Sequence, residues 1–285
     1  MFQHTLNSSV STTGVGLHTG HPVSVTFHPA PESTGIIFRR LINEKWLPVK
    51  TDPFSVYETR LCTCVGEGNI TVMTVEHVLS AFAGMEIDNA YVDIDGEEMP
   101  IWDGSSAPIV WLITRAGIRQ QTALRRFVSV NRLIRVETPD GKWAQLEPYD
   151  GYQIQFTIDF PQAVVKNSPD TVCFEVKRDL YLEEVGRART FGFVHEVEAL
   201  RSQGLARGGS FSSAVVLDEF EVLNPEGMRY PDELVRHKVL DALGDLYILG
   251  APLKASFKAY KSGHALNNQL LRALISDSTA WSYSY

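Results

Sequence analysis

The architecture can be built outward from Pro231-Asp-Glu-Leu-Val-Arg-His-Lys-Val-Leu-Asp-Ala-Leu-Gly-Asp-Leu-Tyr-Ile-Leu-Gly250. Proline suits the first turn of a helix and glycine its end, so this stretch predicts one helix over residues 231–250. His237, Asp241 and Asp245 recur every fourth residue and therefore lie on one helix face, between apolar neighbours. Burying an imidazole and two carboxylates without partners is costly, and a divalent cation would offset that cost.

This spacing alone does not identify a metal site. A second histidine, His28, also has an acid four residues later, Glu32. Prolines between those two residues forbid a helix, so that pair is interpreted as part of a surface loop. His237 and Asp241 taken alone fit metal ligands and a solvated or core-paired contact equally well, so other residues have to decide.

Composition limits the class of protein. With 285 residues, of which 44% are hydrophobic, the chain can fill one large core or two modest ones, and two domains are expected. A net charge of -8 argues against binding to a phosphate backbone, so no nucleic-acid partner is expected. Cys62, Cys64 and Cys173 are an odd number without Cys-x-x-Cys spacing, which favours a reducing compartment over a disulfide scaffold.

The amino terminus lacks a basic region followed by an apolar core, and no apolar run approaches about 18 residues. These features predict a soluble cytoplasmic protein with no transmembrane segment. A monomer is expected.

The first part of the chain predicts a compact α+β unit over residues 1–122. Short β-rich runs alternate with turn clusters up to about residue 65. A helix is then expected over residues 74–83, with Thr74 as its cap and Gly84 as its end, which places Glu76 and His77 in its first turn. A strand, a glycine- and proline-rich loop and a second helix are expected to follow, over residues 90–94, 95–106 and 107–116.

The second part, residues 123–285, predicts another α+β unit, because strand patterns resume after a polar, basic stretch at 117–126. Strands are expected at 127–130, 133–137, 143–147, 152–160 and 255–260. Helices are expected at 179–186, 194–203 and 266–276, besides the one at 231–250.

Two short matches suggest an internal duplication. Val75-Glu-His77 and Val235-Arg-His237 begin helices in the two halves, and each histidine is followed seven residues later by a glycine, Gly84 or Gly244. If the halves are equivalent and face each other, His77 is brought to His237.

Two histidines and one aspartate, His77, His237 and Asp241, would form a three-ligand zinc set that leaves a fourth position for water or substrate. Such an arrangement is typical of a catalytic site. Glu76, beside a ligand, could accept a proton from the bound water, whereas its alternative role is that of an acid complementing the helix dipole. Asp245 is placed to orient a histidine.

Two further residues stay open from the sequence alone. His264 is predicted on a turn ahead of a helix, where a solvated side chain is common. Thr190, in Arg189-Thr-Phe-Gly-Phe193, fits a helix cap and a hydroxyl donor to a developing oxyanion equally well.

In combination and order, several motifs closely resemble the UDP-3-O-acyl-N-acetylglucosamine deacetylase family of lipid A biosynthesis. They extend across nearly the whole chain: Gly14-Val-Gly-Leu-His-Thr-Gly20, Leu61-Cys-Thr-Cys64, Thr74-Val-Glu-His77, Ile87-Asp-Asn89, Asp103-Gly-Ser105, Arg189-Thr-Phe-Gly-Phe193, Arg236-His-Lys-Val-Leu-Asp-Ala-Leu-Gly-Asp245 and Tyr260-Lys-Ser-Gly-His-Ala-Leu-Asn-Asn268.

The resemblance implies a zinc-dependent deacetylase that hydrolyses the N-acetyl group of UDP-3-O-acyl-N-acetylglucosamine and releases acetate. One zinc ion per chain is expected, with iron(II) as the alternative metal in the cell. The implied metal ligands are His77, His237 and Asp241. The implied catalytic roles are general base for Glu76, general acid for His264, oxyanion donor for Thr190 and support of the histidine acid for Asp245. The substrate, a UDP-linked acylated glucosamine, is expected to contact Lys238, Phe191, Leu61, Gly209 and Ser210.

The resemblance also implies the fold: two similar two-layer α/β sandwich domains packed face to face, with the active site between them. An insertion over residues 194–217 is expected to form the passage for the substrate's acyl chain. Arg207 departs from the apolar residue usual at that position, which bears on the width and polarity of the passage. Tail-controlled proteolytic turnover, found in members with a longer carboxyl terminus, is not expected.

Overall fold

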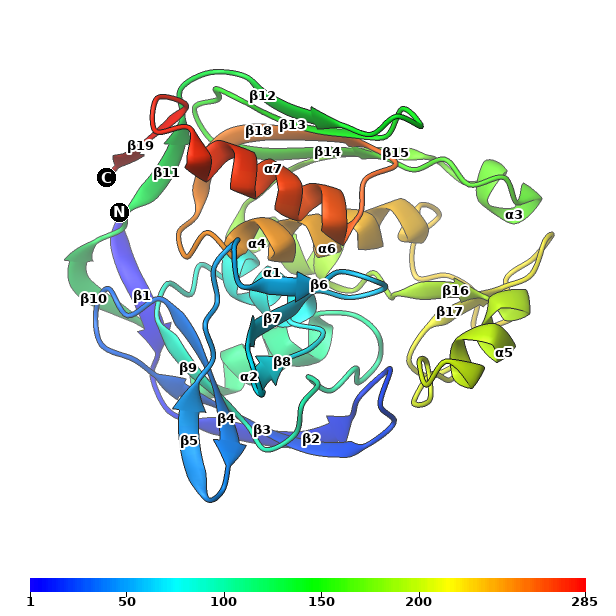
Figure 1. The fold of residues 1–285 in the computed structure, drawn as a ribbon, viewed down its shortest axis with the longest axis horizontal. Helices are drawn as coiled ribbons and strands as arrows, with labels where there is room; N and C mark the ends of the chain where they lie inside the picture. The colour runs from blue at the N-terminus through cyan, green and yellow to red at the C-terminus, as the bar shows by residue number, and fades with distance from the viewer.

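Two mixed β-sheets enclose a layer of helices in the computed structural model, which describes residues 1–285 (Figure 1). The sheet of the first half has the strand order β2-β3-β9-β4-β5. Alternating buried and exposed side chains along its strands explain why one face packs on the helices. Its strands are β2 Val10–Val15, β3 Pro22–Pro29, β9 Ala90–Ile94, β4 Ile36–Ile42 and β5 Lys45–Pro48.

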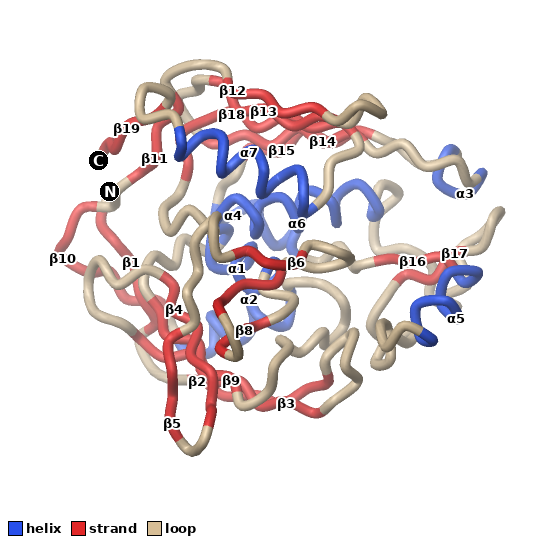
Figure 2. Tube along the Cα trace, in the orientation of Figure 1, coloured by secondary structure: helices blue, strands red, loops and turns tan.

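The sheet of the second half has the order β12-β13-β18-β11-β19, and β14 pairs with both β18 and β15. Its strands are β12 Ile134–Glu137, β13 Trp143–Glu147, β18 Leu253–Tyr260, β11 Phe127–Val130, β19 Trp281–Ser284, β14 Tyr152–Thr157 and β15 Thr171–Glu175. Helices α6 Glu233–Tyr247 and α7 His264–Ser276 lie between this sheet and the helices of the first half, α1 Glu76–Gly84 and α2 Ala107–Ala116 (Figure 2). The predicted class, α+β with layered sandwiches, is confirmed.

The two halves repeat one topological unit. Strands β4 and β9 are parallel neighbours, and α1 lies in the connection between them. Strands β14 and β18 are likewise parallel, and α6 lies in their connection. Parallel neighbours need such a crossover. The repeat agrees with the duplication that the paired histidine-glycine interval predicts.

Helices α1 and α6 pack closely because Gly244 has no side chain. A Cβ atom at this position would lie 1.9 Å from the carbonyl oxygen of Glu76. Gly84, the corresponding glycine of the first half, faces the ring of Tyr181 in the same way, and a Cβ atom there would lie 2.3 Å from Cγ of that ring. Gly84 and Gly244, the two glycines seven residues after the histidines, are therefore sites of close packing.

Gly244→Ala is expected to destabilise the protein by about 1–3 kcal/mol, because the added methyl group forces the two helices apart. Thermal unfolding measures the effect. Gly263→Ala is the matched control, since a Cβ there meets no atom within 4 Å. Equal melting temperatures for the two variants would contradict this account of the helix contact.

The remaining elements join these layers. The chain termini lie close together (Figure 1), and β1 pairs with β10 beside them. The other elements are β1 Phe2–Leu6, β6 Val56–Glu58, β7 Cys64–Glu67, β8 Ile70–Val72, β10 Ile118–Leu124, α3 Ala163–Lys166, α4 Arg178–Tyr181, the π-helical turn Leu182–Gly186, β16 Phe191–Phe193, α5 Val194–Ser202 and β17 Val215–Leu217.

Several boundaries differ from the sequence-based predictions. Helix α6 begins at Glu233, so Pro231 precedes it, and it ends at Tyr247. The prediction that Thr74 caps α1 is wrong: its φ is +60°, and its hydroxyl donates to Glu98 instead of a helix amide. The polar stretch at 117–126, expected to separate the two α+β units, contains strand β10, which is hydrogen-bonded to β1.

The core is continuous across the helix layer and contains aromatic and aliphatic side chains from both halves, including Phe38, Phe82 and Phe257. Burial of this apolar area is the main source of stability. None of the helices is long and apolar enough to cross a membrane.

Candidate functional site

His77, His237 and Asp241 meet where α1 packs on α6. Nε2 of His77 lies 3.5 Å from Oδ1 of Asp241, and Nε2 of His237 lies 3.2 Å from the same oxygen. All three residues are buried, and their ligand atoms lie within 4.8 Å of one another. The two histidine rings have centroids 5.1 Å apart, so the prediction that the two halves bring these histidines together is confirmed.

Neighbouring groups orient these three side chains. Nδ1–H of His237 donates to the carbonyl oxygen of Ala188 at 3.1 Å, which directs the lone pair of Nε2 toward the cluster. Nζ of Lys238 donates to Oδ2 of Asp241 at 2.7 Å and leaves Oδ1 facing the histidines. Burial lowers the pKa of His237 to about 3. Burial raises the pKa of Asp241, but His237 and Lys238 outweigh it, so this pKa is lowered. A neutral imidazole and an ionised carboxylate are the forms that bind a metal.

Glu76 and His264 form a second pair beside the cluster. Oε1 of Glu76 lies 3.9 Å from Nε2 of His264, and both side chains are buried. Oε2 of Glu76 accepts a hydrogen bond from the amide of Thr63 at 3.0 Å. Burial raises the pKa of Glu76 to about 6, against the opposing effect of His264 and His77. A carboxylate with a raised pKa, next to three side chains that could hold a metal ion, suits proton transfer near neutral pH.

Asp245 orients His264. Its Oδ2 accepts hydrogen bonds from Nδ1 of His264 and from Nδ2 of Asn267, each at 2.9 Å. Burial lowers the pKa of His264, but the negative charges of Asp245 and Glu76 outweigh it and raise this pKa to about 10. The imidazole is therefore held protonated, with Nε2–H directed toward Glu76 and the cluster.

Two residues of this network have no role in the sequence-based predictions. The hydroxyl of Thr63 donates to Oδ1 of Asp245 at 2.6 Å, and its amide donates to Oε2 of Glu76. Thr63 therefore links these two carboxylates. Asn267 lies three residues after His264 on the same helix. That spacing, which places side chains on one helix face, is the signal that could have identified it.

Thr190 lies directly before β16, next to Phe191, whose ring centroid is 6.4 Å from that of His237. Its amide donates to the carbonyl oxygen of Gly104, and its carbonyl oxygen accepts from the amide of Val215, each at 2.8 Å. The backbone is thereby fixed, while the hydroxyl makes no hydrogen bond within the protein. Helix α5 starts at Val194 and has Phe193 as its N-cap, so the interpretation of Thr190 as a helix cap is wrong.

An apolar cavity of about 430 Å³ opens beside Thr190. Leu17, His18 and Leu61 from the first half form one wall, and the segment from Thr190 through the expected insertion forms the others. Four of the predicted substrate-binding residues line it: Leu61, Phe191, Gly209 and Ser210. The fifth, Lys238, lies outside this lining, and its Nζ is 5.6 Å from the ring centroid of Phe191.

Arg207 does not line this cavity: its side chain is exposed, and the guanidinium packs over Gly204. Other residues of the 194–217 segment, such as Val197, Leu200 and Phe211, line the cavity. Outward orientation of a long cationic side chain keeps its charge in water.

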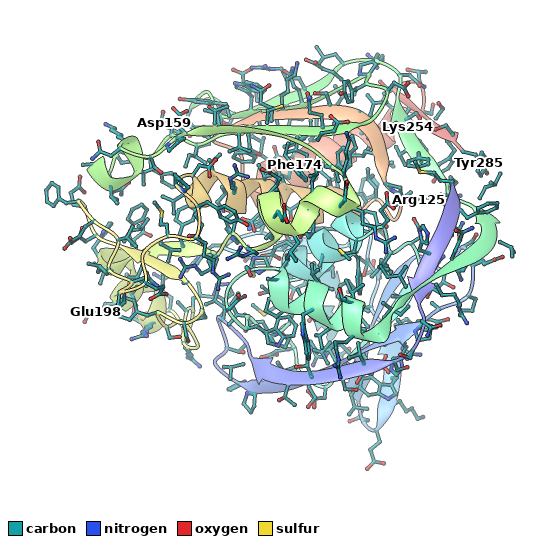
Figure 3. All side chains as sticks on the ribbon, turned by 180° about the vertical axis from the view of Figure 1, so that it is seen from behind. Arg125, Asp159, Phe174, Glu198, Lys254 and Tyr285 are labelled. Atoms are coloured by element: carbon teal, nitrogen blue, oxygen red, sulfur yellow. The ribbon has the colours of Figure 1, made fainter.

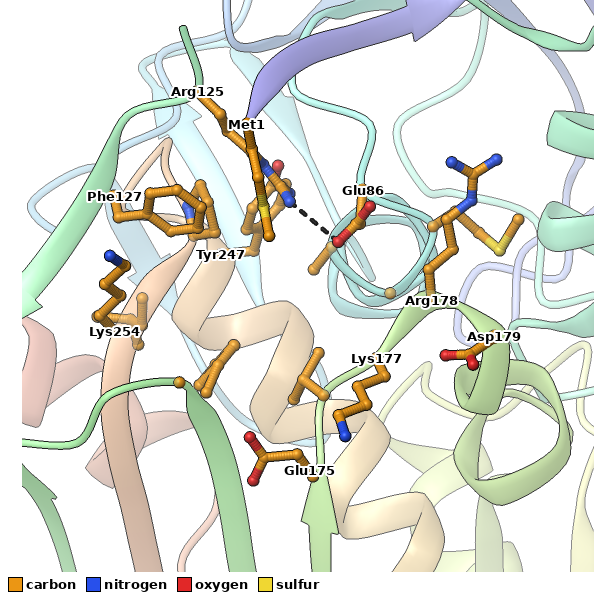
Figure 4. Close-up of a pocket in the computed structure, with 18 of the residues that line it drawn as sticks. Met1, Glu86, Arg125, Phe127, Glu175, Lys177, Arg178, Asp179, Tyr247 and Lys254 are labelled. Carbon is orange, nitrogen blue, oxygen red and sulfur yellow. Dashed lines mark ion pairs between the residues drawn. The ribbon is translucent and has the colours of Figure 1, made fainter. Parts of the chain in front are cut away.

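A larger cavity of about 790 Å³ lies at the other ends of α1 and α6, next to Gly84 and Tyr247 (Figure 4). Arg125, Lys177 and Glu175 are among its charged lining residues, but none of the candidate residues Glu76, His77, His237, Asp241 and His264 lines it. Seen from behind, Arg125 lies at the end of the molecule away from Glu198 of α5 (Figure 3). This cavity is separate from the candidate site.

Comparisons with known proteins place the chain in a family. The family model for UDP-3-O-acyl N-acetylglycosamine deacetylase matches residues 3–276. A protein named UDP-3-O-acyl-N-acetylglucosamine deacetylase in Acidithiobacillus ferrooxidans is 52% identical over 281 residues, which cover 99% of this chain and 92% of that relative.

Proteins of the same name in Idiomarina loihiensis and Neisseria meningitidis serogroup B are 49% and 47% identical, respectively. These matches cover 99% of this chain and 92% of each relative. The matched residues include every member of the buried cluster, which lies between residues 76 and 264. On this extent of similarity, the chain belongs to the UDP-3-O-acyl N-acetylglycosamine deacetylase family.

Proposed function

We propose that this protein is a zinc-dependent deacetylase that hydrolyses the N-acetyl group of UDP-3-O-acyl-N-acetylglucosamine and releases acetate, as a step in lipid A biosynthesis. The observation that carries the proposal is the position of Glu76 and His264 beside the three-ligand cluster of His77, His237 and Asp241. The relatives' names supply the substrate.

The donor set fits zinc. Two imidazole nitrogens and one carboxylate oxygen are typical of a catalytic zinc ion that keeps one position for water or substrate, and iron(II) is the alternative metal. When bound, the metal lowers the pKa of its water and polarises the carbonyl group of the substrate. A structural site would need a fourth protein ligand, whereas the carboxylate beside this cluster, Glu76, is held by the amide of Thr63 and faces His264.

The surrounding residues can move the protons of amide hydrolysis. Glu76 accepts a proton from the attacking water, whose oxygen forms the new bond to the acetyl carbon. His264 donates its Nε2 proton to the sugar nitrogen as the carbon–nitrogen bond breaks, so acetate and a free amine are formed. Asp245 keeps His264 oriented and protonated until that step. Thr190 donates its hydroxyl proton in a hydrogen bond to the developing oxyanion.

The two ends of the substrate meet different surfaces. The apolar cavity accepts the 3-O-acyl chain, and each buried methylene group contributes about 0.8 kcal/mol before its ordering cost is subtracted. Lys238 contacts the charged part of the substrate. We also propose that the chain divides into domains at 1–122 and 123–285 and acts in the cytoplasm as a monomer.

The direct test is an assay of acetate and free amine released from synthetic UDP-3-O-acyl-N-acetylglucosamine. One acetate per amine is expected. UDP-N-acetylglucosamine without the 3-O-acyl chain is the comparison substrate and should react with a much lower kcat/KM. Efficient cleavage of N-acetyl sugars irrespective of the acyl chain or nucleotide would contradict the proposed substrate.

Gly192→Leu is expected to lower kcat/KM for long-chain substrates more than for short-chain ones. Gly192 lines the cavity, and a Cβ there meets no atom within 4 Å, so the larger side chain fills open space that the acyl chain uses. Losing room for two methylene groups corresponds to roughly tenfold in kcat/KM.

Arg207→Leu is the matched control, because that side chain is exposed and outside the lining. Its preference for acyl length should equal that of the wild type. The measurement is kcat/KM across a series of acyl lengths. A changed preference in Arg207→Leu together with an unchanged one in Gly192→Leu would place the acyl chain elsewhere.

A further inference from the structure

A buried carboxylate, Glu98, lies beneath the first-half wall of the apolar cavity. Only 2% of its surface is exposed. Its Oε1 accepts a hydrogen bond from the amide of His18 at 2.8 Å, and its Oε2 accepts one from the amide of Thr19 at 2.7 Å. The hydroxyl of Thr74 also donates to Oε1, at 3.2 Å. The hydrogen-bond partners of this carboxylate are two backbone amides and one hydroxyl.

These contacts hold the turn over residues 16–20, which connects β2 to β3. Within the turn, the amide of Gly20 donates to the carbonyl oxygen of Gly16 at 3.1 Å. A Cβ at Gly16 would lie 2.4 Å from Oε2 of Glu98, so glycine is required for the carboxylate to reach the two amides. The shape of the turn and the position of Glu98 therefore depend on each other.

The same turn forms one side of the acyl cavity. Leu17 and His18 line that cavity. Their carbonyl oxygens accept hydrogen bonds from the insertion: the amide of Gly208 donates to Leu17 at 3.0 Å, and the amide of Arg207 donates to His18 at 3.3 Å. The two walls, one from each half of the molecule, are thus joined through the turn that Glu98 holds.

Glu98 also contacts the start of the catalytic helix. The backbone of Glu98 pairs with Met73, and its side chain binds Thr74, two residues before Glu76. One carboxylate therefore fixes the distance between the cavity wall and the proton-transfer group. Burying an anion is costly, and hydrogen bonds from amides to a carboxylate are among the stronger ones that offset the cost.

We infer that Glu98 is a positioning residue that sets the acyl-chain specificity of the reaction, by holding the turn 16–20 against the insertion. This inference rests on the proposed function, because it assigns the acyl chain to the cavity. Glu98 touches neither the cluster nor the reacting atoms, so its loss changes the fit of the chain more than the chemistry.

Glu98→Gln tests the inference because glutamine keeps the shape of the side chain but has a single acceptor oxygen. Its amide group would face one of the two backbone N–H groups, which loses one charge-assisted hydrogen bond and moves the turn. The probes are UDP-N-acetylglucosamine substrates with a 3-O-dodecanoyl or a 3-O-butanoyl chain. The ratio of kcat/KM for the long chain to that for the short chain is expected to fall roughly tenfold, mainly through KM.

Glu97→Gln is the matched control: it makes the same charge change at the neighbouring, exposed position. Its ratio should equal that of the wild type. Gly208→Ala provides a second variant if Glu98→Gln does not fold, because the added Cβ would lie 2.2 Å from the carbonyl oxygen of Gly16 and push the insertion off the turn. It should lower the ratio as well.

Calorimetric affinities for both substrates are measured beside the kinetics, in proteins that also carry Glu76→Gln to slow cleavage, so the result does not depend on turnover. An equal loss for long and short chains, or an unchanged ratio in folded Glu98→Gln and Gly208→Ala, would overturn the inference. Wild-type protein that binds both substrates with the expected preference but cleaves neither would instead count against the proposed function.

Discussion

Glu76→Gln is expected to lower kcat by roughly a hundredfold or more, because glutamine keeps the size of the side chain but cannot accept the proton from water. Metal content should stay at the wild-type level, since Glu76 is not one of the three ligands of the proposed site. Steady-state kinetics with elemental analysis of the same sample measures both quantities.

The pH profile of kcat/KM distinguishes the loss of a general base from a loss of activity caused by disturbed structure. Ionised Glu76 and protonated His264 are required together, so kcat/KM of the wild type should rise as Glu76 loses its proton and fall at higher pH as His264 loses its own. Glu76→Gln should lose the acidic limb, and His264→Gln should lose the alkaline one. If both variants kept wild-type profiles, the proton transfers would have to be assigned to other groups.

His237→Ala and Asp241→Ala are expected to abolish tight metal binding and, with it, nearly all activity. The cluster offers three protein ligands, so removing one leaves two, too few for a stable site. The loss of Asp241 also leaves Lys238 without its carboxylate partner at 2.7 Å. Metal per chain, measured by elemental analysis after dialysis, should fall from one to near zero.

His195→Ala is the control for these variants, because His195 is an exposed histidine of α5 outside the cluster. It should keep one metal ion per chain. Circular dichroism checks that the ligand variants remain folded. Full metal occupancy in folded His237→Ala and Asp241→Ala would exclude the cluster as the metal site.

The sequence predicted the parts of the site that follow from regular spacing. His237, Asp241 and Asp245 share a helix face because they are four residues apart. The repeated histidine-glycine interval anticipated that His77 meets His237, whose ring centroids are 5.1 Å apart. Glycine at these positions also permits the close helix contact, which a Cβ at Gly244 would prevent.

Contacts made by the backbone could not be predicted in this way. The carbonyl oxygen of Ala188 orients His237, and the amide of Thr63 holds Glu76, but neither contact depends on the identity of the residue that provides it. Thr74 has a side chain typical of a helix cap, yet its hydroxyl binds Glu98 from a distant segment. Tertiary hydrogen bonds of this kind override local preference.

The central claim is that a metal held by His77, His237 and Asp241 enables removal of the N-acetyl group. The most direct test is a titration: metal is removed with a chelator, zinc is added back in steps, and acetate release from UDP-3-O-acyl-N-acetylglucosamine is followed. The account predicts no release from the metal-free protein and a rise that reaches its maximum at one equivalent of zinc. Undiminished acetate release from the metal-free protein would contradict it.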